Sequence, residues 1–215
     1  MGQHATRYVP AAGHDLFTPL YDPLIGLLMR ERAFRQRFFE QADIRPGHRV
    51  LDLGCGTGTM AILIRQHVPD AAMIGVDGDP KVLEIARRKA AKASVSIEFD
   101  ESFADRLPYP DASFDRGLSS LVLHHLTHED KLGALREVRR VLAAGGSFHL
   151  ADFAPPVGLW ASLITRVVAR GERIGENLAG ALPRLVAEVG FENVEDRGHH
   201  NALFGTIGFL SARRE

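Results

Sequence analysis

Glycines at alternate positions in one short stretch are the most specific chemical signal in the sequence. Gly54, Gly56 and Gly58 follow the predicted strand 49–53, and helical spacing begins at Thr59. Glycine has no Cβ, so such a stretch turns tightly and lets a ligand approach the backbone closely. In an open α/β sheet this turn lies at the carboxyl end of a strand, where ligands bind. A tight turn without a ligand is the alternative.

Two phosphate-binding patterns fit this stretch poorly. The dinucleotide fingerprint G-x-G-x-x-G requires a third glycine at position 59. In this sequence position 59 is Thr59, and the third glycine, Gly58, lies one residue earlier. A phosphate loop needs a lysine followed by serine or threonine, and the stretch has none. The loop therefore matches neither pattern well.

An acidic residue, Asp77, ends the next predicted strand, 72–76. A carboxylate at that place can accept hydrogen bonds from two ribose hydroxyls, which fits a dinucleotide or any other adenosine ligand. The alternative role is a helix cap. Because Asp79 and Pro80 already supply a cap, we favour the ribose role.

Histidines supply the candidates for a general base. His124 and His125 follow the predicted fourth strand, and histidine changes charge near neutral pH. We expect at least one of the pair to pack or to cap the next helix, and we choose His124 as the candidate base or substrate contact. His199 and His200 have no cysteine or acid at ligand spacing beside them, so we expect a solvated turn there and no metal site.

Alternating strands and helices must position these residues. Apolar runs and helical spacing predict strands at 49–53, 72–76, 95–99, 113–119 and 147–152, and helices at 23–40, 59–67, 81–91, 159–170 and 178–189. A further helix opens at a capping box at 127–130 and ends at Gly145-Gly146. Residues 191–210 predict two strands joined near 198–201, which must be antiparallel because the connection is short. The fold class is α/β, a mostly parallel sheet with helices on both faces.

The composition is typical of one globular domain. The chain has 215 residues, 45% hydrophobic and 25% charged, with a formal net charge of −1. That charge gives no bulk attraction to nucleic acid, so no nucleic-acid partner is expected. The sequence shows no membrane span and no signal peptide, and we expect a cytoplasmic protein.

Several motifs together resemble the class I S-adenosylmethionine-dependent methyltransferases: VLDLGCGTG, VDGDP, LPYPDASFD and LVLHHLTHEDKLGALREVRRVLAAGG. Within that class, the sequence is most similar to the group that includes the ubiquinone and menaquinone biosynthesis methyltransferases. The resemblance is strong over residues 45–155. It implies a Rossmann-like, seven-stranded sheet with an antiparallel last strand, S-adenosyl-L-methionine as the cofactor and a small-molecule methyl acceptor.

The resemblance also implies a set of cofactor-binding residues in the loops after the strands. They are Asp52, Gly54, Cys55, Gly56 and Gly58 around the methionine part, Asp77 at the ribose, Gly78 beside the adenine, and Ser119 and Ser120 near the methionine amino group. Many relatives carry an Asp-Ala pair against the adenine, and Phe103-Ala104 stands in that place here. Phe103 either packs against the adenine ring or fills core. A nucleophilic role for Cys55 is rejected, because no partner residue is indicated.

We expect a single methyltransferase domain over 1–215. Its parts are a helical arm or lid at 1–45, a cofactor-binding half at 46–152, and substrate-shaping helices with the terminal strands at 153–215. Tyr21 and Trp160 are candidate acceptor contacts together with His124, and core or edge packing is the alternative for each. A nicotinamide-dependent oxidoreductase and a non-catalytic protein of the same fold are the alternative functions. The acceptor and the oligomeric state are left open.

Overall fold

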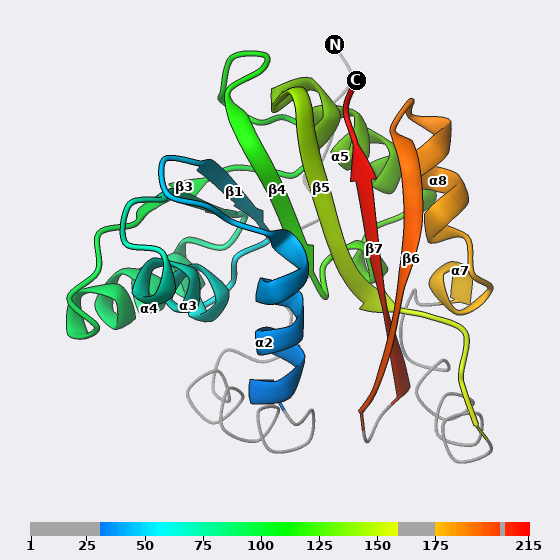
Figure 1. Ribbon diagram of the computed structural model, residues 1–215, viewed down its shortest axis with the longest axis horizontal. Helices are drawn as coiled ribbons and strands as arrows, with labels where there is room; N and C mark the ends of the chain where they lie inside the picture. The colour runs from blue at the N-terminus through cyan, green and yellow to red at the C-terminus, as the bar shows by residue number, and fades with distance from the viewer. Residues whose placement is uncertain (1–30, 159–174, 203–204) are drawn as a thin grey trace, which may run out of the picture.

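The computed structural model describes residues 31–158, 175–202 and 205–215. Within them, seven strands form one sheet in the order β3-β2-β1-β4-β5-β7-β6 (Figure 1). The strands are β1 (Arg49–Leu53), β2 (Ala72–Asp77), β3 (Glu98–Glu101), β4 (Phe114–Ser120), β5 (Leu142–Phe153), β6 (Glu192–Ala202) and β7 (Gly205–Arg213). Strands β1 to β5 run parallel, and β7 is antiparallel to both β5 and β6. The predicted fold class is confirmed.

Helices cover both faces of the sheet, because side chains that alternate along each strand are apolar on both sides. One buried cluster joins Val50 and Leu118 to α2 (Glu31–Ala42), α3 (Thr59–His67) and α4 (Pro80–Lys92). The other joins Leu51 and Phe148 to α5 (His128–Val141) and α8 (Leu182–Glu188). Two short helices, η1 (Leu123–His125) and α7 (Gly175–Leu178), complete the described elements. Figure 1 shows the sheet between these two helical layers.

Two helices begin at the predicted caps. The Asp79 carboxylate accepts a hydrogen bond of 2.8 Å from the Lys81 backbone N–H, with Pro80 opening α4. The Thr127 hydroxyl accepts from the Asp130 backbone N–H at 3.3 Å at the start of α5. Each cap satisfies a backbone donor that the first helical turn would otherwise leave unpaired.

Three predicted boundaries are wrong, and glycines cause two of the errors. Helix α5 ends at Val141 rather than at Gly145-Gly146, because Leu142 already pairs with Phe114 and the glycines lie where the register of β4 and β5 shifts. The hairpin does not turn at 198–201. That segment, with His199 and His200, lies inside β6, and Gly198 (φ +87°) stands at a register shift. The helix predicted at 178–189 is shorter and begins at Leu182, after α7.

One further predicted strand differs from the structure by a few residues, and several predictions concern residues that the structure does not describe. The third strand is found at 98–101 rather than 95–99. Tyr21, Trp160, the arm up to residue 30 and the helix at 159–170 lie outside the described residues. Among the described residues, no helix is both long and apolar enough to cross a membrane.

Candidate functional site

The glycine loop bends against the end of β2 at the carboxyl edge of the parallel strands. The backbone N–H groups of Gly54 and Cys55 both donate to the Val76 carbonyl, at 2.8 and 2.9 Å. Gly54 has φ +68°, and a Cβ there would lie 2.3 Å from Val122 Cγ2. At Gly56 (φ +52°) a Cβ would meet nothing within 4 Å. The backbone at Gly56 therefore faces open space that a ligand can enter.

Asp77 ties this loop to the end of β2. One carboxylate oxygen accepts from the Gly56 backbone N–H at 2.9 Å, and the other accepts from the Asp79 backbone N–H at 3.0 Å. Burial raises the pKa of Asp77, and these two backbone donors oppose that rise. A carboxylate offers about four acceptor positions, so both oxygens keep capacity for ligand hydroxyls. The residue supports the turn and remains suited to bind a diol.

Asp52 is a buried acid with an unsatisfied oxygen. It is 1% exposed, and its Oδ2 atom has no hydrogen-bond partner among the described residues. Burial raises the pKa of the Asp52 carboxyl to about 7; the Arg35 charge opposes this rise and the Asp77 charge adds to it. A buried acceptor without a donor is costly to the fold. A cationic or N–H-bearing ligand group at this loop would satisfy it.

Phe103 lies beside the turn after Asp77. It is 47% exposed, so it does not fill the core. Its Cε1 atom is 3.3 Å from the position that a Cβ of Gly78 would take, and the neighbouring Ser102 backbone N–H donates to the Asp77 carbonyl at 3.1 Å. The ring therefore offers an exposed apolar surface next to the acid that the sequence assigns to a ribose.

Helix α5 holds the loop that follows Phe103. Gly133, Glu137 and Arg140 are spaced four and three residues apart, so they share one face of the helix. A Cβ on Gly133 would lie 3.1 Å from the Asp105 Cβ, so helix and loop are in close contact.

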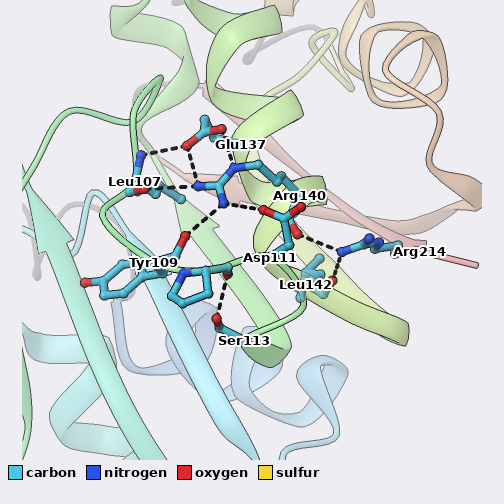
Figure 2. Close-up of polar contacts among 9 residues, drawn as sticks. Leu107, Tyr109, Asp111, Ser113, Glu137, Arg140, Leu142 and Arg214 are labelled. Atoms are coloured by element: carbon cyan, nitrogen blue, oxygen red, sulfur yellow. Dashed lines mark hydrogen bonds and ion pairs between the residues drawn. The ribbon is translucent and has the colours of Figure 1, made fainter.

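The Arg140 guanidinium is the centre of this attachment (Figure 2). It donates to the carbonyls of Leu107 and Tyr109 at 3.0 and 2.8 Å, and to the Asp111 carboxylate at 2.7 Å. Glu137 binds the same guanidinium at 2.7 Å and accepts from the Leu107 backbone N–H at 2.8 Å. Several charge-assisted bonds to one loop fix its path. The segment that carries Phe103 and Ala104 is thereby anchored.

A histidine and an acid meet at the ends of η1 and β5. His124 Nδ1 lies 2.8 Å from Asp152 Oδ1, and the His124 backbone N–H donates to Asp152 Oδ2 at 3.2 Å. His124 is 5% exposed and Asp152 is 1% exposed. Burial alone would raise the pKa of Asp152, but the His124 charge and hydrogen bonds hold it below its usual value. A carboxylate accepts only, so His124 Nδ1 carries the proton and Nε2 is the basic nitrogen.

His125 differs from its neighbour. Burial, followed by the charge of His124, lowers the pKa of His125 to about 4, so its ring is neutral at pH 7. The two rings are 3.9 Å apart between centroids. Among the described residues, His124 is the member of the pair that is hydrogen-bonded to an acid, Asp152. The arrangement matches the base-and-orienting-acid pairs of known active sites.

The remaining predicted residues lie around the same edge of the sheet. Ser119 is fully buried, and its hydroxyl has no hydrogen-bond partner within the described part of the chain. Ser120 ends β4, and Ala104 packs half-buried on the core. Cys55 is 9% exposed, and burial raises the pKa of its thiol, so it stays protonated and is a poor nucleophile. Among the described residues, no group of three histidines, cysteines or acids could hold a metal ion.

Sequence reasoning missed Asp152, Glu137 and Arg140. Asp152 stands at the end of the fifth strand, the same kind of position that singled out Asp77, and that signal could have been used. Nothing in the sequence spacing links Arg140 to the loop at 107–111, because that contact depends on how α5 packs.

The chain is similar to known methyltransferases. Residues 50–146 match the methyltransferase domain family. A demethylmenaquinone methyltransferase of Deinococcus radiodurans is 38% identical over 140 residues, which cover 64% of this chain and 57% of the relative. A ubiquinone/menaquinone biosynthesis C-methyltransferase of Xanthomonas campestris is 36% identical over 153 residues, covering 70% of this chain and 58% of the relative.

Solved structures share the fold at lower identity. The YcgJ protein of Bacillus subtilis superposes with a TM-score of 0.68 at 20% identity, covering 86% of this chain and 99% of that chain. Against the two sequence relatives above, the matched region spans less than two thirds of the relative's own length.

Proposed function

Residues 50–146 belong to the methyltransferase domain family, and from this premise we propose that the chain transfers the methyl group of S-adenosyl-L-methionine to a small-molecule acceptor. One observation carries the proposal: the unsatisfied Oδ2 atom of Asp52 is buried beside a glycine loop with open space at Gly56. The α-ammonium of a methionine moiety would supply the missing donor. A sulfonium methyl donor, when bound, supplies an already activated methyl group.

Different residues of the site are proposed to bind different parts of the cofactor. We assign Asp52, Gly54, Cys55, Gly56 and Gly58, with the Ser119-Ser120 strand end, to the methionine part. Asp77 accepts from the ribose hydroxyls, and Gly78, Phe103 and Ala104 bind the adenine, with Phe103 against the ring face. The bonds from Arg140 and Glu137 keep the adenine-side loop in place.

His124 and Asp152 supply base catalysis. An acceptor O–H or activated C–H must lose its proton as the new bond to the methyl carbon forms. His124 Nε2 takes that proton, and the Asp152 carboxylate holds the imidazole in the required tautomer and stabilises its positive charge. Exclusion of water and alignment of the acceptor provide the rest of the rate enhancement.

The acceptor is proposed to be a phenol or quinol. The relatives named above act, by their names, in menaquinone and ubiquinone biosynthesis, and a dyad of histidine and acid suits an acceptor that must be deprotonated. The arm at 1–45, the cofactor-binding half at 46–152 and the segment at 153–215 together make the proposed single domain. Tyr21 and Trp160 are the proposed contacts to the acceptor.

The test is transfer of a labelled methyl group from S-adenosyl-L-methionine to a panel of quinols, phenols, amines and lipid headgroups. We expect a methylated quinol or phenol, and we expect the Asp152→Asn variant to bind S-adenosylhomocysteine normally while losing most of the turnover. Intact cofactor binding with no product from any acceptor would contradict catalysis and favour a non-catalytic binding protein.

A further inference from the structure

The glycine loop packs against α4 at its third glycine. A Cβ on Gly58 would lie 3.0 Å from the Ala86 Cβ atom and 2.9 Å from the Phe99 Cζ atom. At Gly56, by contrast, a Cβ would meet nothing within 4 Å. Helices α3 and α4 lie side by side on the same face of the sheet (Figure 1). The loop therefore has an open side at Gly56 and a packed side at Gly58, where α4 supports it.

Lys89, which follows Ala86 by three residues on the same face of α4, reaches the two threonines that flank Gly58. Its Nζ atom donates to Thr57 Oγ1 at 2.9 Å and to Thr59 Oγ1 at 2.6 Å. The two hydroxyl oxygens are themselves 3.4 Å apart. An ammonium group has three N–H donors, and its hydrogen bonds are stronger than those between neutral groups. One side chain of α4 thus holds the residues before and after Gly58.

The stability of α3 does not explain an ammonium group at this place. Thr59 is the first residue of α3, and Gly58 at the N-cap has no side chain that could cap the helix. The N-terminal end of a helix carries a partial positive charge, so it favours anions and disfavours a cation. This repulsion opposes the gain from the two hydrogen bonds. The net contribution of Lys89 to the free energy of unfolding should therefore be small.

We propose that Lys89 is a positioning residue for the cofactor-binding loop, an inference that rests on the proposed function. The three glycines of the loop have positive φ, between +52° and +73°. Glycine regains more conformational freedom than any other residue when a loop is released. By holding Thr57 and Thr59, Lys89 keeps the loop in its binding conformation before the cofactor arrives. A preformed loop lowers the entropy cost of binding, so the ammonium strengthens cofactor binding without contacting the cofactor.

The first experiment measures the affinity of the full chain for S-adenosylhomocysteine by calorimetry. Lys89→Met keeps a long side chain but removes the ammonium, and it should weaken binding about fivefold. The midpoint of urea unfolding without ligand should change little. Lys92→Met is the matched control, because Lys92 is an exposed lysine in the same last turn of α4, and it should leave both measurements unchanged. Wild-type affinity in Lys89→Met, or a large fall of its unfolding midpoint, would overturn the proposal.

A double-mutant cycle tests whether Lys89 acts through the two threonines. Thr57→Val and Thr59→Val together remove both acceptor hydroxyls with little change in side-chain shape. The protein with both valines should bind S-adenosylhomocysteine about as weakly as Lys89→Met does. Adding Lys89→Met to it should cause no further loss of affinity, because the interaction is already absent. If the two losses multiply instead, Lys89 does not act through these hydroxyls and the proposal fails.

Amide hydrogen exchange without ligand separates this inference from the proposed function. The Gly56 N–H donates to the Asp77 carboxylate, and the Gly58 N–H donates to the Cys55 carbonyl. In Lys89→Met both amides should exchange faster than in the wild type, because the loop opens more often. Unchanged exchange at both glycines would overturn the proposal. A wild-type chain that does not bind S-adenosylhomocysteine would instead contradict the proposed function, whereas the exchange rates would still report whether Lys89 holds the loop.

Discussion

Replacing Asp52 by asparagine should stabilise the fold while it weakens cofactor binding. The residue is 1% exposed, its Oδ2 atom lacks a partner in the described ranges of the chain, and burial raises the pKa of its carboxyl from an ordinary value of 3.8 to about 7. In the unfolded chain the same carboxyl ionises freely. The folded protein therefore carries a penalty at any pH where the unfolded carboxyl is charged.

The magnitude follows from the pKa difference. A group whose pKa is higher in the folded state contributes least to the free energy of unfolding at high pH. For Asp52, this stabilising contribution is complete below about pH 4 and is lost as the pH rises through about 7. The full difference corresponds to about 4 kcal/mol. Because asparagine does not ionise, the stability advantage of Asp52→Asn should grow by about 2 to 3 kcal/mol between about pH 5 and about pH 8.5.

The assay is urea unfolding of both proteins at the two pH values, with and without S-adenosylhomocysteine. We expect the variant to be the more stable protein at about pH 8.5 without ligand, and the ligand to stabilise the wild type more than the variant. Leu53→Ala, at a buried neighbour on the same strand, is the control and should lower stability equally at both pH values. A variant that is less stable at high pH, or an effect that does not change with pH, would refute the reasoning on Asp52.

Three further predictions concern the loop, the dyad and the anchor. Gly56→Ala places a methyl group in open space at φ +52°. It should lower the free energy of unfolding by only about 1 kcal/mol, measured by urea unfolding, but block cofactor binding, measured by calorimetry. His124→Gln should lower kcat by about 10²- to 10⁴-fold with little change in S-adenosylhomocysteine affinity, and equal rates for variant and wild type would exclude the base role. Arg140→Ala removes the bonds that hold the loop at 107–111 and should weaken the affinity for S-adenosylhomocysteine by about tenfold, with partial recovery in Arg140→Lys. An unchanged affinity for S-adenosylhomocysteine would mean that the bonds from Arg140 have no part in adenine binding.

The sequence predicted the parts of the fold that rest on local patterns. The strand, glycine loop and helix at 49–67 are found as expected, because a buried strand, residues without Cβ and helical spacing each leave a local mark. The position of Asp77 at the end of the second strand could be predicted for the same reason, because the short apolar run before it marks that strand. The short connection also predicted correctly that the last two strands are antiparallel.

Two of the errors arise at glycines, because glycine occurs both in turns and helix ends and at register shifts within strands. Gly198 and the Gly145-Gly146 pair suggested a turn and a helix end, yet both stand at register shifts within strands. Gly145 and Gly198 have positive φ there, as glycines in turns and helix ends also do. Which structure forms depends on the partner strand, and that information is not local. The pairing of His124 with Asp152 joins residues 28 positions apart and became visible only in the folded chain.

Calorimetric titration of the full chain with S-adenosylhomocysteine and with NADH tests the central claim most directly. The account predicts one S-adenosylhomocysteine bound per chain, with an affinity that falls below about pH 7 as Asp52 takes up a proton. It also predicts much weaker binding of NADH, because the third glycine of the dinucleotide fingerprint is displaced. NADH binding tighter than S-adenosylhomocysteine, or no S-adenosylhomocysteine binding at all, would contradict it.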